Sequence, residues 1–344
     1  MSGKDCLKAS ALGVPLFLLF SYSFFMTGWV TYSLHLFIPV APQHIIECSF
    51  FHSERKFHLS DYLASRSTFN ATPPDHDCSA IRRRRYLPMD IPSFVHFPYN
   101  LFFIRHVSKD YDFVEKSLTM MFSPHHFYCI TIDKNATEEF KDRVRLLGRC
   151  LFNVIVPEED FDGSEGRGYF ESHRACFDKM SRYTWRHAII SQEEEIPAQS
   201  VRWMSMKASR LGNASLLGSS YLGVNKLDQP IFNGSAISSA VSFWWTNRTD
   251  PLIISRPFQP KLYSFLLANG TIERIIKSAP PANHSLHCKT GRKDDFGNCI
   301  LGMEDFNVAA KGRRAFVRAD SQFDFGFVQC MHETVFKRTY KDIL

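Results

Sequence analysis

Short apolar runs alternate with amphipathic segments along the chain from residue 100 onward. The runs at 101–107 (LFFIRHV) and 127–132 (FYCITI) are almost continuously apolar, as expected for strands buried on both faces of a sheet. Strands that alternate with helices predict an α/β fold with a mostly parallel sheet. The full pattern predicts strands at 101–107, 127–132, 153–156 and 187–190, and helices at 111–121, 137–147 and 169–181.

The beginning of the chain is apolar in a different way. No Asp, Glu, Lys or Arg occurs within residues 9–46, and a helix of about 20 apolar residues suffices to cross a bilayer. Lys4 and Lys8 precede this run, which favours a cytosolic N-terminus. A cleaved signal peptide is the alternative, but its apolar core is typically only about 7–15 residues long. We therefore predict a cytosolic tail at 1–10 and a type II transmembrane signal anchor at 11–34.

Two further features predict that the rest of the chain lies in the lumen of the secretory pathway, and we expect the Golgi membrane. The sequence has nine cysteines, and without Cys6 of the cytosolic tail an even number remains for disulfides in an oxidising compartment. Seven N-x-S/T sequons also suit a glycosylated compartment. The sequons lie at Asn70, Asn135, Asn213, Asn233, Asn247, Asn269 and Asn283.

The pattern divides the lumenal part into a stem and a domain. Residues 35–95 have the character of a stem, because they include Thr72-Pro73-Pro74 and many polar residues without sustained periodicity. The basic run Arg82–Arg85 is either a processing site for a protease or a solvated surface. The regular pattern predicts a single domain at 96–344.

Composition excludes few classes of function. The chain has 344 residues, of which 44% are hydrophobic and 22% charged, as in ordinary globular proteins. The formal net charge of +6 is dispersed, and basic residues do not alternate with aromatic ones, so we do not expect a nucleic-acid partner. The sequence contains no Walker loop, no G-x-S-x-G elbow and no H-E-x-x-H motif.

Three acidic residues, at two places in the chain, are candidates for ligand binding. Asp133 follows the predicted strand at 127–132, and ligands of parallel α/β sheets bind beyond the carboxyl ends of the strands. Asp133 therefore either accepts hydrogen bonds from a nucleotide base or ribose, or caps a turn. Asp160 and Asp162 form a D-x-D pair, which either holds a divalent cation or belongs to an acidic loop.

Several segments follow one another in an order that is similar to a known family. They are FYCITIDK at 127–134, GRCLFNVIV at 148–156, Ala175-Cys176, WRHAIIS at 185–191 with Glu195-Ile196-Pro197, Gly234-Ser235-Ala236, CILGMEDF at 299–306, and Arg318 through FDFGFVQC at 323–330. From about Asn100 to Lys337 the chain thereby resembles the core-2/I-branching β-1,6-N-acetylglucosaminyltransferases, a family with xylosyltransferase relatives.

The resemblance implies a GT-A-like single catalytic domain and a specific reaction. Members of the family transfer N-acetylglucosamine with inversion from UDP-GlcNAc to a glycan or glycoprotein acceptor, with no metal or other cofactor. The resemblance also implies four disulfides, each of which would stabilise the fold by about 2–4 kcal/mol. The implied pairs are Cys48–Cys330, Cys78–Cys150, Cys129–Cys176 and Cys288–Cys299.

The resemblance assigns basic residues to the donor. Without a metal, fixed cations must offset the negative charge that develops on the departing diphosphate. The family's terminal lysine corresponds to Arg318, and its second basic residue, between the last cysteine pair, corresponds to Arg292 or Lys293. The spacing at this second position differs from the family, so Arg292 and Lys293 could equally be surface charges.

The acceptor side departs from the family. Inverting transfer needs a carboxylate that takes the proton of the attacking hydroxyl. The family's Asp-Glu pair corresponds to Gln259-Pro260, and the nearest acidic residue downstream is Glu273. One hypothesis is therefore a working glycosyltransferase in which Glu273 or another carboxylate serves as the base. A second is a catalytically impaired relative that binds UDP, a glycan or a partner enzyme, and a third is a structural anchor without a ligand.

Overall fold

A computed structural model describes most of the predicted domain and parts of the predicted stem. The described residues are 22–23, 46–52, 56–66, 77–85, 87, 97, 100–163, 167–211, 215–217, 220–222, 252–257, 259–260, 288–294, 299–312 and 314–343. The chain divides into two compact units, Met1–Gln43 with Leu344 and His44–Ile343. The predicted tail (1–10) and anchor (11–34) lie outside the described residues, apart from residues 22–23. Among the described helices, none combines the length and the apolar character needed to cross a membrane.

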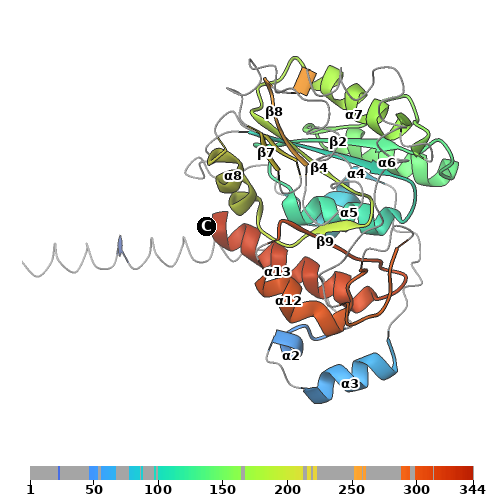
Figure 1. The fold of residues 1–344 in the computed structure, drawn as a ribbon, viewed down its shortest axis with the longest axis vertical. Coiled ribbons are helices and arrows are strands. Elements are labelled where there is room, and N and C mark those ends of the chain that lie inside the picture. Colours follow the sequence, from blue (N-terminus) through green and yellow to red (C-terminus); the bar gives the residue numbers. More distant parts are fainter. Residues whose placement is uncertain are drawn as a thin grey trace, which may run out of the picture. The chain divides into compact units, whose positions relative to one another are not determined.

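The unit His44–Ile343 is built on a mixed sheet of seven strands in the order β3-β2-β1-β4-β8-β6-β7 (Figure 1). β1 pairs in parallel with β2 and β4, and β2 pairs in parallel with β3. β8 is antiparallel to β4, and β6 is antiparallel to β8. The predicted parallel α/β arrangement is thus confirmed for β1 to β4. The strands are β1 (Leu101–Val107), β2 (Phe127–Ile132), β3 (Val154–Ile155), β4 (His187–Ser191), β6 (Ser215–Leu217), β7 (Ser220–Leu222) and β8 (Leu252–Ser255).

β1 is buried along its whole length because helices cover both faces of the sheet. Successive side chains of a strand point to opposite faces. Phe103 and Val107 belong to the core on one face, whereas Phe102 points to the other face and contacts Phe177, with 5.7 Å between the ring centroids. This double burial explains why the strand reads as an unbroken apolar run.

The helices are distributed as the strand order requires. α5 (Tyr111–Met121) and α6 (Glu138–Cys150) pack on one face, and α7 (Arg167–Met180) packs on the other (Figure 1). Right-handed crossovers from β1 to β2 and from β2 to β3 put α5 and α6 on the same side. The return from β3 to β4, on the far side of β1, puts α7 on the opposite side.

Local side-chain chemistry fixes the start of α6. Thr137 Oγ1 accepts a hydrogen bond from the N–H of Phe140 at 3.3 Å, as an N-cap residue does. Glu138 and Glu139 lie in the first turn, where the helix dipole favours negative charge. The helix begins where the sequence predicts, but it continues to Cys150 instead of ending at 147.

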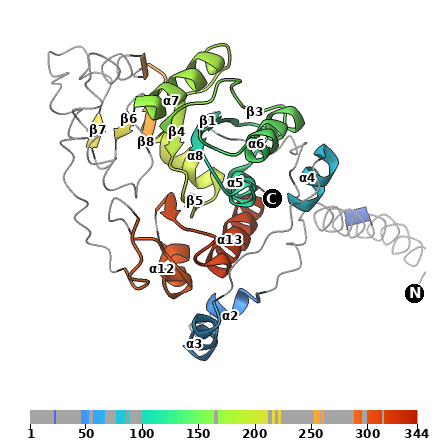
Figure 2. The same ribbon diagram turned by 90° about the vertical axis from the view of Figure 1, so that its right-hand side faces the viewer.

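A second apolar core lies on the other side of α5. It contains α12 (Phe306–Lys311), α13 (Phe325–Ile343) and a two-stranded antiparallel sheet of β5 (Glu195–Pro197) and β9 (Phe316–Arg318). α13 packs alongside α5 (Figure 2). Phe113 and Met120 of α5 are buried in this second core, so α5 connects it to the core under the main sheet.

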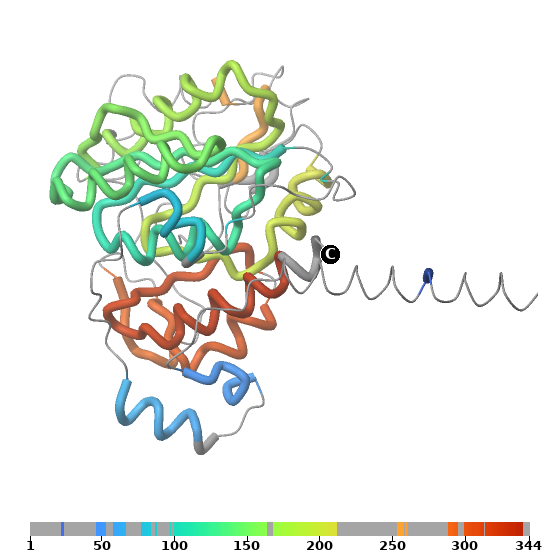
Figure 3. Tube along the Cα trace, turned by 180° about the vertical axis from the view of Figure 1, so that it is seen from behind, coloured from blue at the N-terminus to red at the C-terminus, as the bar shows by residue number. Residues whose placement is uncertain are grey.

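Where the structure describes the predicted stem, it contains three helices that the sequence did not reveal: α2 (Ser49–His52), α3 (Lys56–Ala64) and α4 (Cys78–Arg85). α2 and α3 lie beside the C-terminal segment (Figure 3). Cys48 and Phe51 are buried in the second core. Residues of the predicted stem therefore contribute to the compact unit that starts at His44.

The basic run forms the last turn of α4. Arg82 donates a hydrogen bond to the carbonyl of Cys150 at 2.6 Å, which holds this helix against the end of α6. The backbone at 82–85 is helical, and both interpretations of the run stay predictions.

All four disulfides implied by the resemblance are present, and their pairing is confirmed. They are Cys48–Cys330, Cys78–Cys150, Cys129–Cys176 and Cys288–Cys299. The first two connect residues of the predicted stem to α13 and α6.

Candidate functional site

The connections of the sheet diverge between β1 and β4. β1 leads through α5 to β2 on one side, whereas β4 on the other side is reached from β3 through α7. Ligands of α/β proteins bind beyond the carboxyl ends of the strands at such a switch point. Glu193, just after β4, links the carboxyl ends of β4 and β1. Its carboxylate accepts hydrogen bonds from Ser108 Oγ at 2.8 Å and from the N–H of Lys109 at 2.9 Å, both just after β1.

A buried arginine holds the turn that follows β4. Arg105 of β1 donates through Nη1 to Ser117 Oγ, and through Nη2 to the carbonyls of Glu193 and Glu195, the last at 2.7 Å. Burial lowers the pKa of Arg105 to about 10, although the nearby Glu193 and Glu195 oppose this effect, so the side chain is charged at neutral pH. Sequence analysis did not select Arg105, and its signal was a cation within the apolar run LFFIRHV.

Asp133 lies at the carboxyl end of β2 and is largely occupied by local hydrogen bonds. Its Oδ1 accepts from the N–H of Asn135 at 2.7 Å, and its Oδ2 accepts from the N–H of Gly163 at 2.9 Å. The first bond, to the residue two positions on, is the Asx turn that sequence analysis kept as an alternative. An ionised carboxylate has about four lone-pair positions, so capping does not exhaust its capacity to accept.

His106 and Gly163 complete the surroundings of Asp133, and sequence analysis missed both. Nε2 of His106 lies 3.3 Å from Oδ2 of Asp133, and Nδ1 lies 3.0 Å from Thr131 Oγ1. Burial lowers the pKa of His106, and the hydrogen bond with Asp133 offsets this only in part. A Cβ atom at Gly163 would lie 2.8 Å from both Asp133 Oδ2 and His106 Nε2, so any larger residue there would displace them.

The D-x-D pair does not form a shared carboxylate site among the described residues. Asp160 turns to α6, where it pairs with Arg145 at 2.9 Å and with Lys141 at 3.3 Å. Asp162 is exposed, and the residue before it, Phe161, forms an isolated backbone bridge with Asp133. Within the described ranges there is no group of three His, Cys, Asp or Glu side chains that could hold a metal ion.

Arg318 is buried at the same edge of the sheet. It is the last residue of β9 and lies opposite Glu195 of β5, directly after the turn that follows β4. Its Nη2 pairs with the carboxylates of Glu194 and of Asp294, the latter at 2.9 Å, and the side chain is only 3% exposed. Nε and Nη1 have no hydrogen-bond partner among the described residues.

The loop closed by the Cys288–Cys299 disulfide brings a second basic group beside Arg318. The N–H of Ile300 donates to the carbonyl of Arg292 at 3.0 Å, and the N–H of Leu301 donates to the carbonyl of Arg318 at 3.0 Å. Two consecutive residues thus connect the segments that carry these arginines. The Arg292 side chain is 48% exposed and pairs with Asp320 at 3.3 Å. Lys293 forms only a backbone bridge, with Cys299, among its described contacts.

The turn after β9 attaches this basic region to the start of α5. Ser321 Oγ donates to Oδ2 of Asp110, and Oδ1 of the same aspartate caps α5 by accepting from the N–H of Phe113 at 3.1 Å. Asp110 adopts a left-handed backbone conformation with φ of 54°, which Asp tolerates better than most residues. One carboxylate therefore fixes both the loop after β1 and the turn beyond Arg318.

Arg318 and Arg292 therefore lie at the same edge of the sheet as Asp133, but both arginines are already paired with carboxylates. Arg318 faces Glu194 and Asp294, and Arg292 faces Asp320. Lys109 adds one exposed cation, with its Nζ 4.0 Å from Glu194. The resemblance in the sequence implied basic side chains open to a diphosphate, and it gave no sign of these ion pairs.

The acceptor side is described only in part. Pro260, at the position of the family's base, is exposed close to the end of β8, and Glu273 lies outside the described residues. Of the seven sequons, Asn135 alone lies in the described ranges, where it is exposed two residues after Asp133.

The comparison with protein families agrees with the resemblance in the sequence. Residues 101–229, more than a third of the chain, match the family model of the Core-2/I-branching enzymes. The match covers β1 to β4, the turn at Glu193–Glu195 and α8 (Val201–Ser209). A comparison with curated proteins finds none that matches the chain.

Proposed function

We propose that this chain, which carries the Core-2/I-branching family match over residues 101–229, is a glycosyltransferase that uses UDP-GlcNAc. The family is one of glycosyltransferases, which implies a sugar donor and a glycan acceptor. The choice of donor, the inversion and the independence from metals are our proposals, made from the resemblance. The observation that carries them is Arg318, which lies beside Arg292 at the switch point of the sheet with two nitrogens lacking a partner among the described residues.

The spacing of the strands suits a nucleoside diphosphate. β1 separates the end of β2, which carries Asp133, from the end of β4, which leads to Glu194 and Arg318. Adjacent strands lie about 4.8 Å apart, so the two ends are roughly 10 Å apart. In our proposal the nucleoside lies near Asp133 and the diphosphate near Arg318 and Arg292.

The chemistry follows from these positions. An acceptor hydroxyl oxygen attacks the anomeric carbon as the bond from that carbon to the diphosphate oxygen breaks, and a carboxylate takes the hydroxyl proton. Negative charge develops on the leaving diphosphate, and arginines stabilise it through charge-assisted hydrogen bonds. Arg318 can do so through Nε and Nη1, which have no partner among the described residues, whereas Glu194 and Asp294 occupy its Nη2 and offset part of its charge.

A second candidate function is favoured by Gln259-Pro260. Pro260 stands at the position of the family's base and cannot accept a proton. This favours a chain that binds UDP, a glycan or a partner enzyme without efficient turnover. Loss of a general base usually costs about 10²–10⁴-fold in rate. The two candidates therefore differ in turnover and agree in donor binding.

One experiment separates these candidates. The full-length chain is incubated with UDP-GlcNAc and mixed glycan acceptors, with and without a chelator, and UDP binding is measured by calorimetry. Transfer by the wild type supports the first candidate. UDP binding without transfer, together with a gain of at least about tenfold in Pro260→Glu but not in Gln259→Glu, supports the second. Absence of UDP binding would reject both and favour a structural role, whereas a requirement for metal would reject the metal-free mechanism.

Glu194→Gln should tighten UDP binding by about fivefold. This change frees Arg318 from one of its two carboxylates, and a partly exposed ion pair is worth up to about 1 kcal/mol. Glu138→Gln is the matched control: it removes the same charge from a 79% exposed side chain that pairs with Lys141. Calorimetry with UDP measures both variants. Weaker binding in Glu194→Gln would mean that Glu194 itself contacts the nucleotide.

We also propose that the protein is a single-pass type II protein of the Golgi membrane, anchored by residues 11–34. The uncharged run, the sequons and the disulfides support this location. Protease protection in sealed Golgi vesicles tests it: the domain should be degraded only after detergent opens the membrane.

A further inference from the structure

Phe323 lies between the proposed donor site and the N-terminal helices. The guanidinium carbon of Arg292 lies 4.6 Å from the centroid of the Phe323 ring, and that of Arg66 lies 4.7 Å from the same centroid. Arg66 follows α3 by two residues and is 257 positions away from Phe323 in the sequence numbering, so only the fold brings them together. Cationic groups are attracted to the faces of aromatic rings.

Arg66 is fixed on its other sides by two carboxylates. Its Nη1 lies 2.9 Å from Oδ2 of Asp324, and its Nη2 lies 2.9 Å from Oε1 of Glu304. A planar guanidinium held in this way has one orientation, and the neighbouring ring must pack against it. Arg66 therefore sets the position of Phe323.

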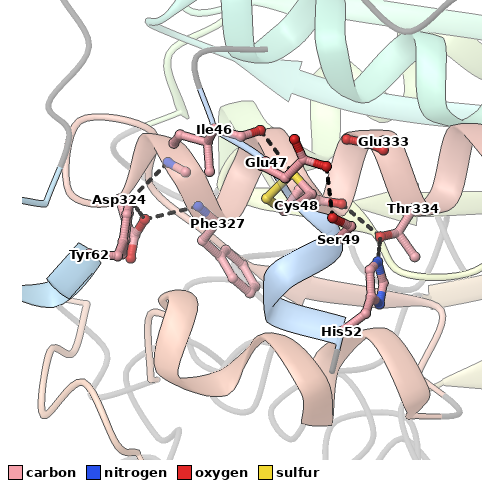
Figure 4. Close-up of a disulfide and its surroundings, with 12 residues drawn as sticks. Ile46, Glu47, Cys48, Ser49, His52, Tyr62, Asp324, Phe327, Glu333 and Thr334 are labelled. Atoms are coloured by element: carbon pink, nitrogen blue, oxygen red, sulfur yellow. Dashed lines mark hydrogen bonds between the residues drawn. A yellow bond between two sulfur atoms is a disulfide. The ribbon is translucent and has the colours of Figure 1, made fainter. Parts of the chain in front are cut away.

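Asp324 anchors the end of the turn that carries Phe323. Its Oδ1 accepts from the N–H of Phe327, as an N-cap of α13 does, and from Tyr62 Oη at 2.5 Å (Figure 4). Its Oδ2 accepts from the N–H of Met303 at 2.9 Å as well as from Arg66. The Asp324 side chain is fully buried, so this carboxylate depends on these donors rather than on water.

Asp320 closes the other end of the same turn. Its Oδ1 accepts from the N–H of Gln322 at 2.9 Å, and its Oδ2 pairs with Arg292 at 3.3 Å. The turn 320–324 thus touches Arg292 at Asp320 and at Phe323, and touches α3 and the residues after it at Phe323 and Asp324. Arg292 is otherwise half exposed, so these contacts define where its guanidinium rests.

We propose that Arg66 is a positioning residue for the donor site: through the ring of Phe323 it holds Arg292 in the orientation that meets the diphosphate. This inference rests on the proposed function. The N-terminal segment at 56–66 is then part of the apparatus that binds the donor, and not only a spacer before the domain. A residue that acts through another should lose its influence when that other residue is removed.

The test measures UDP affinity by calorimetry and thermal unfolding on the full-length chain. Arg66→Met should weaken UDP binding by at least about threefold, the lower range of coupling between residues in contact. In an Arg292→Met background the same change should leave the remaining UDP affinity unaltered, while it still lowers the melting temperature. Arg66→Lys, which keeps the charge but lacks the planar fork, should fold and give an intermediate loss.

Tyr62→Phe is the matched control, because it removes the hydrogen bond to the same Asp324 and the one from the N–H of Gly326, but keeps Arg66, which contacts Phe323. It should lower the melting temperature and change UDP affinity by less than about twofold. Unchanged UDP affinity in both Arg66 variants, or an equal loss in the Arg292→Met background, would overturn the inference and leave the donor site standing. Failure of the wild-type chain to bind UDP would overturn the donor site and this inference with it.

Discussion

Arg105→Met should lower the free energy of unfolding by about 3–5 kcal/mol, because it leaves three buried acceptors without their donor at about 1–3 kcal/mol each. The substitution keeps much of the apolar volume and removes the cation. Its loss leaves Ser117 Oγ and the carbonyls of Glu193 and Glu195 without this donor in a region closed to water. The turn after β4 should then loosen, and UDP binding should weaken together with stability.

Urea unfolding followed by circular dichroism measures this change through the midpoint and the slope. Arg145→Met is the control, because that arginine is 31% exposed and its partner Asp160 keeps a second cation, Lys141. The control should cost less than about 1 kcal/mol. A similar midpoint in both variants would contradict the role given to Arg105 in holding the turn.

Removal of the disulfide between Cys48 and Cys330 should be the second large effect. The two cysteines are 282 positions apart, and the chain-entropy model assigns such a loop about 5.6 kcal/mol. The double variant Cys48→Ala/Cys330→Ala should also release α2 from the second core, since Cys48 and Phe51 are buried there. We expect the melting temperature to fall and the N-terminal segment to become sensitive to protease.

The Cys288–Cys299 pair provides the matched comparison. Its separation is only 11 positions, for which the same model gives about 3 kcal/mol. Thermal unfolding of Cys288→Ala/Cys299→Ala should therefore show the smaller loss of the two. If this pair cost as much as Cys48–Cys330, loop length would not be what determines the stabilisation.

The central part of the fold could be predicted because its strands are buried on both faces. The continuous apolar runs LFFIRHV and FYCITI predict strands buried on both faces, and the helices that follow them have one apolar side. β5, β9 and β8 have three or four residues each, too few to establish a period of two. The weakly patterned helix α3 in the predicted stem was missed for a similar reason, since its packing depends on distant segments.

The pairing of the cysteines could not come from spacing. Eight cysteines allow 105 pairings, and only the family resemblance selected the one that the structure contains. Local spacing gives no indication that Cys48 meets Cys330.

The sequence predicted where Asp133 lies in the candidate site. It did not predict which carboxylates pair with the arginines of that site. A residue directly after a buried parallel strand lies at the edge where ligands bind, so its position follows from the pattern. The pair between Arg318 and Glu194 joins residues 124 positions apart, and the stacking of Arg66 on Phe323 depends on the same long-range packing. Ion pairs of this kind depend on tertiary structure, which is why the sequence suggested freer arginines than the fold contains.

The disulfides of Cys48 and Cys78 would keep the chain in one covalent piece after cleavage of the backbone in the arginine run at 82–85. Both bridges cross residues 82–85, because one joins Cys48 to Cys330 and the other joins Cys78 to Cys150. A backbone nicked there would yield two fragments on an electrophoresis gel only after a reducing agent had been added. Secretion of a freed domain, the usual outcome of trimming a stem, would therefore require thiol exchange as well as a peptidase.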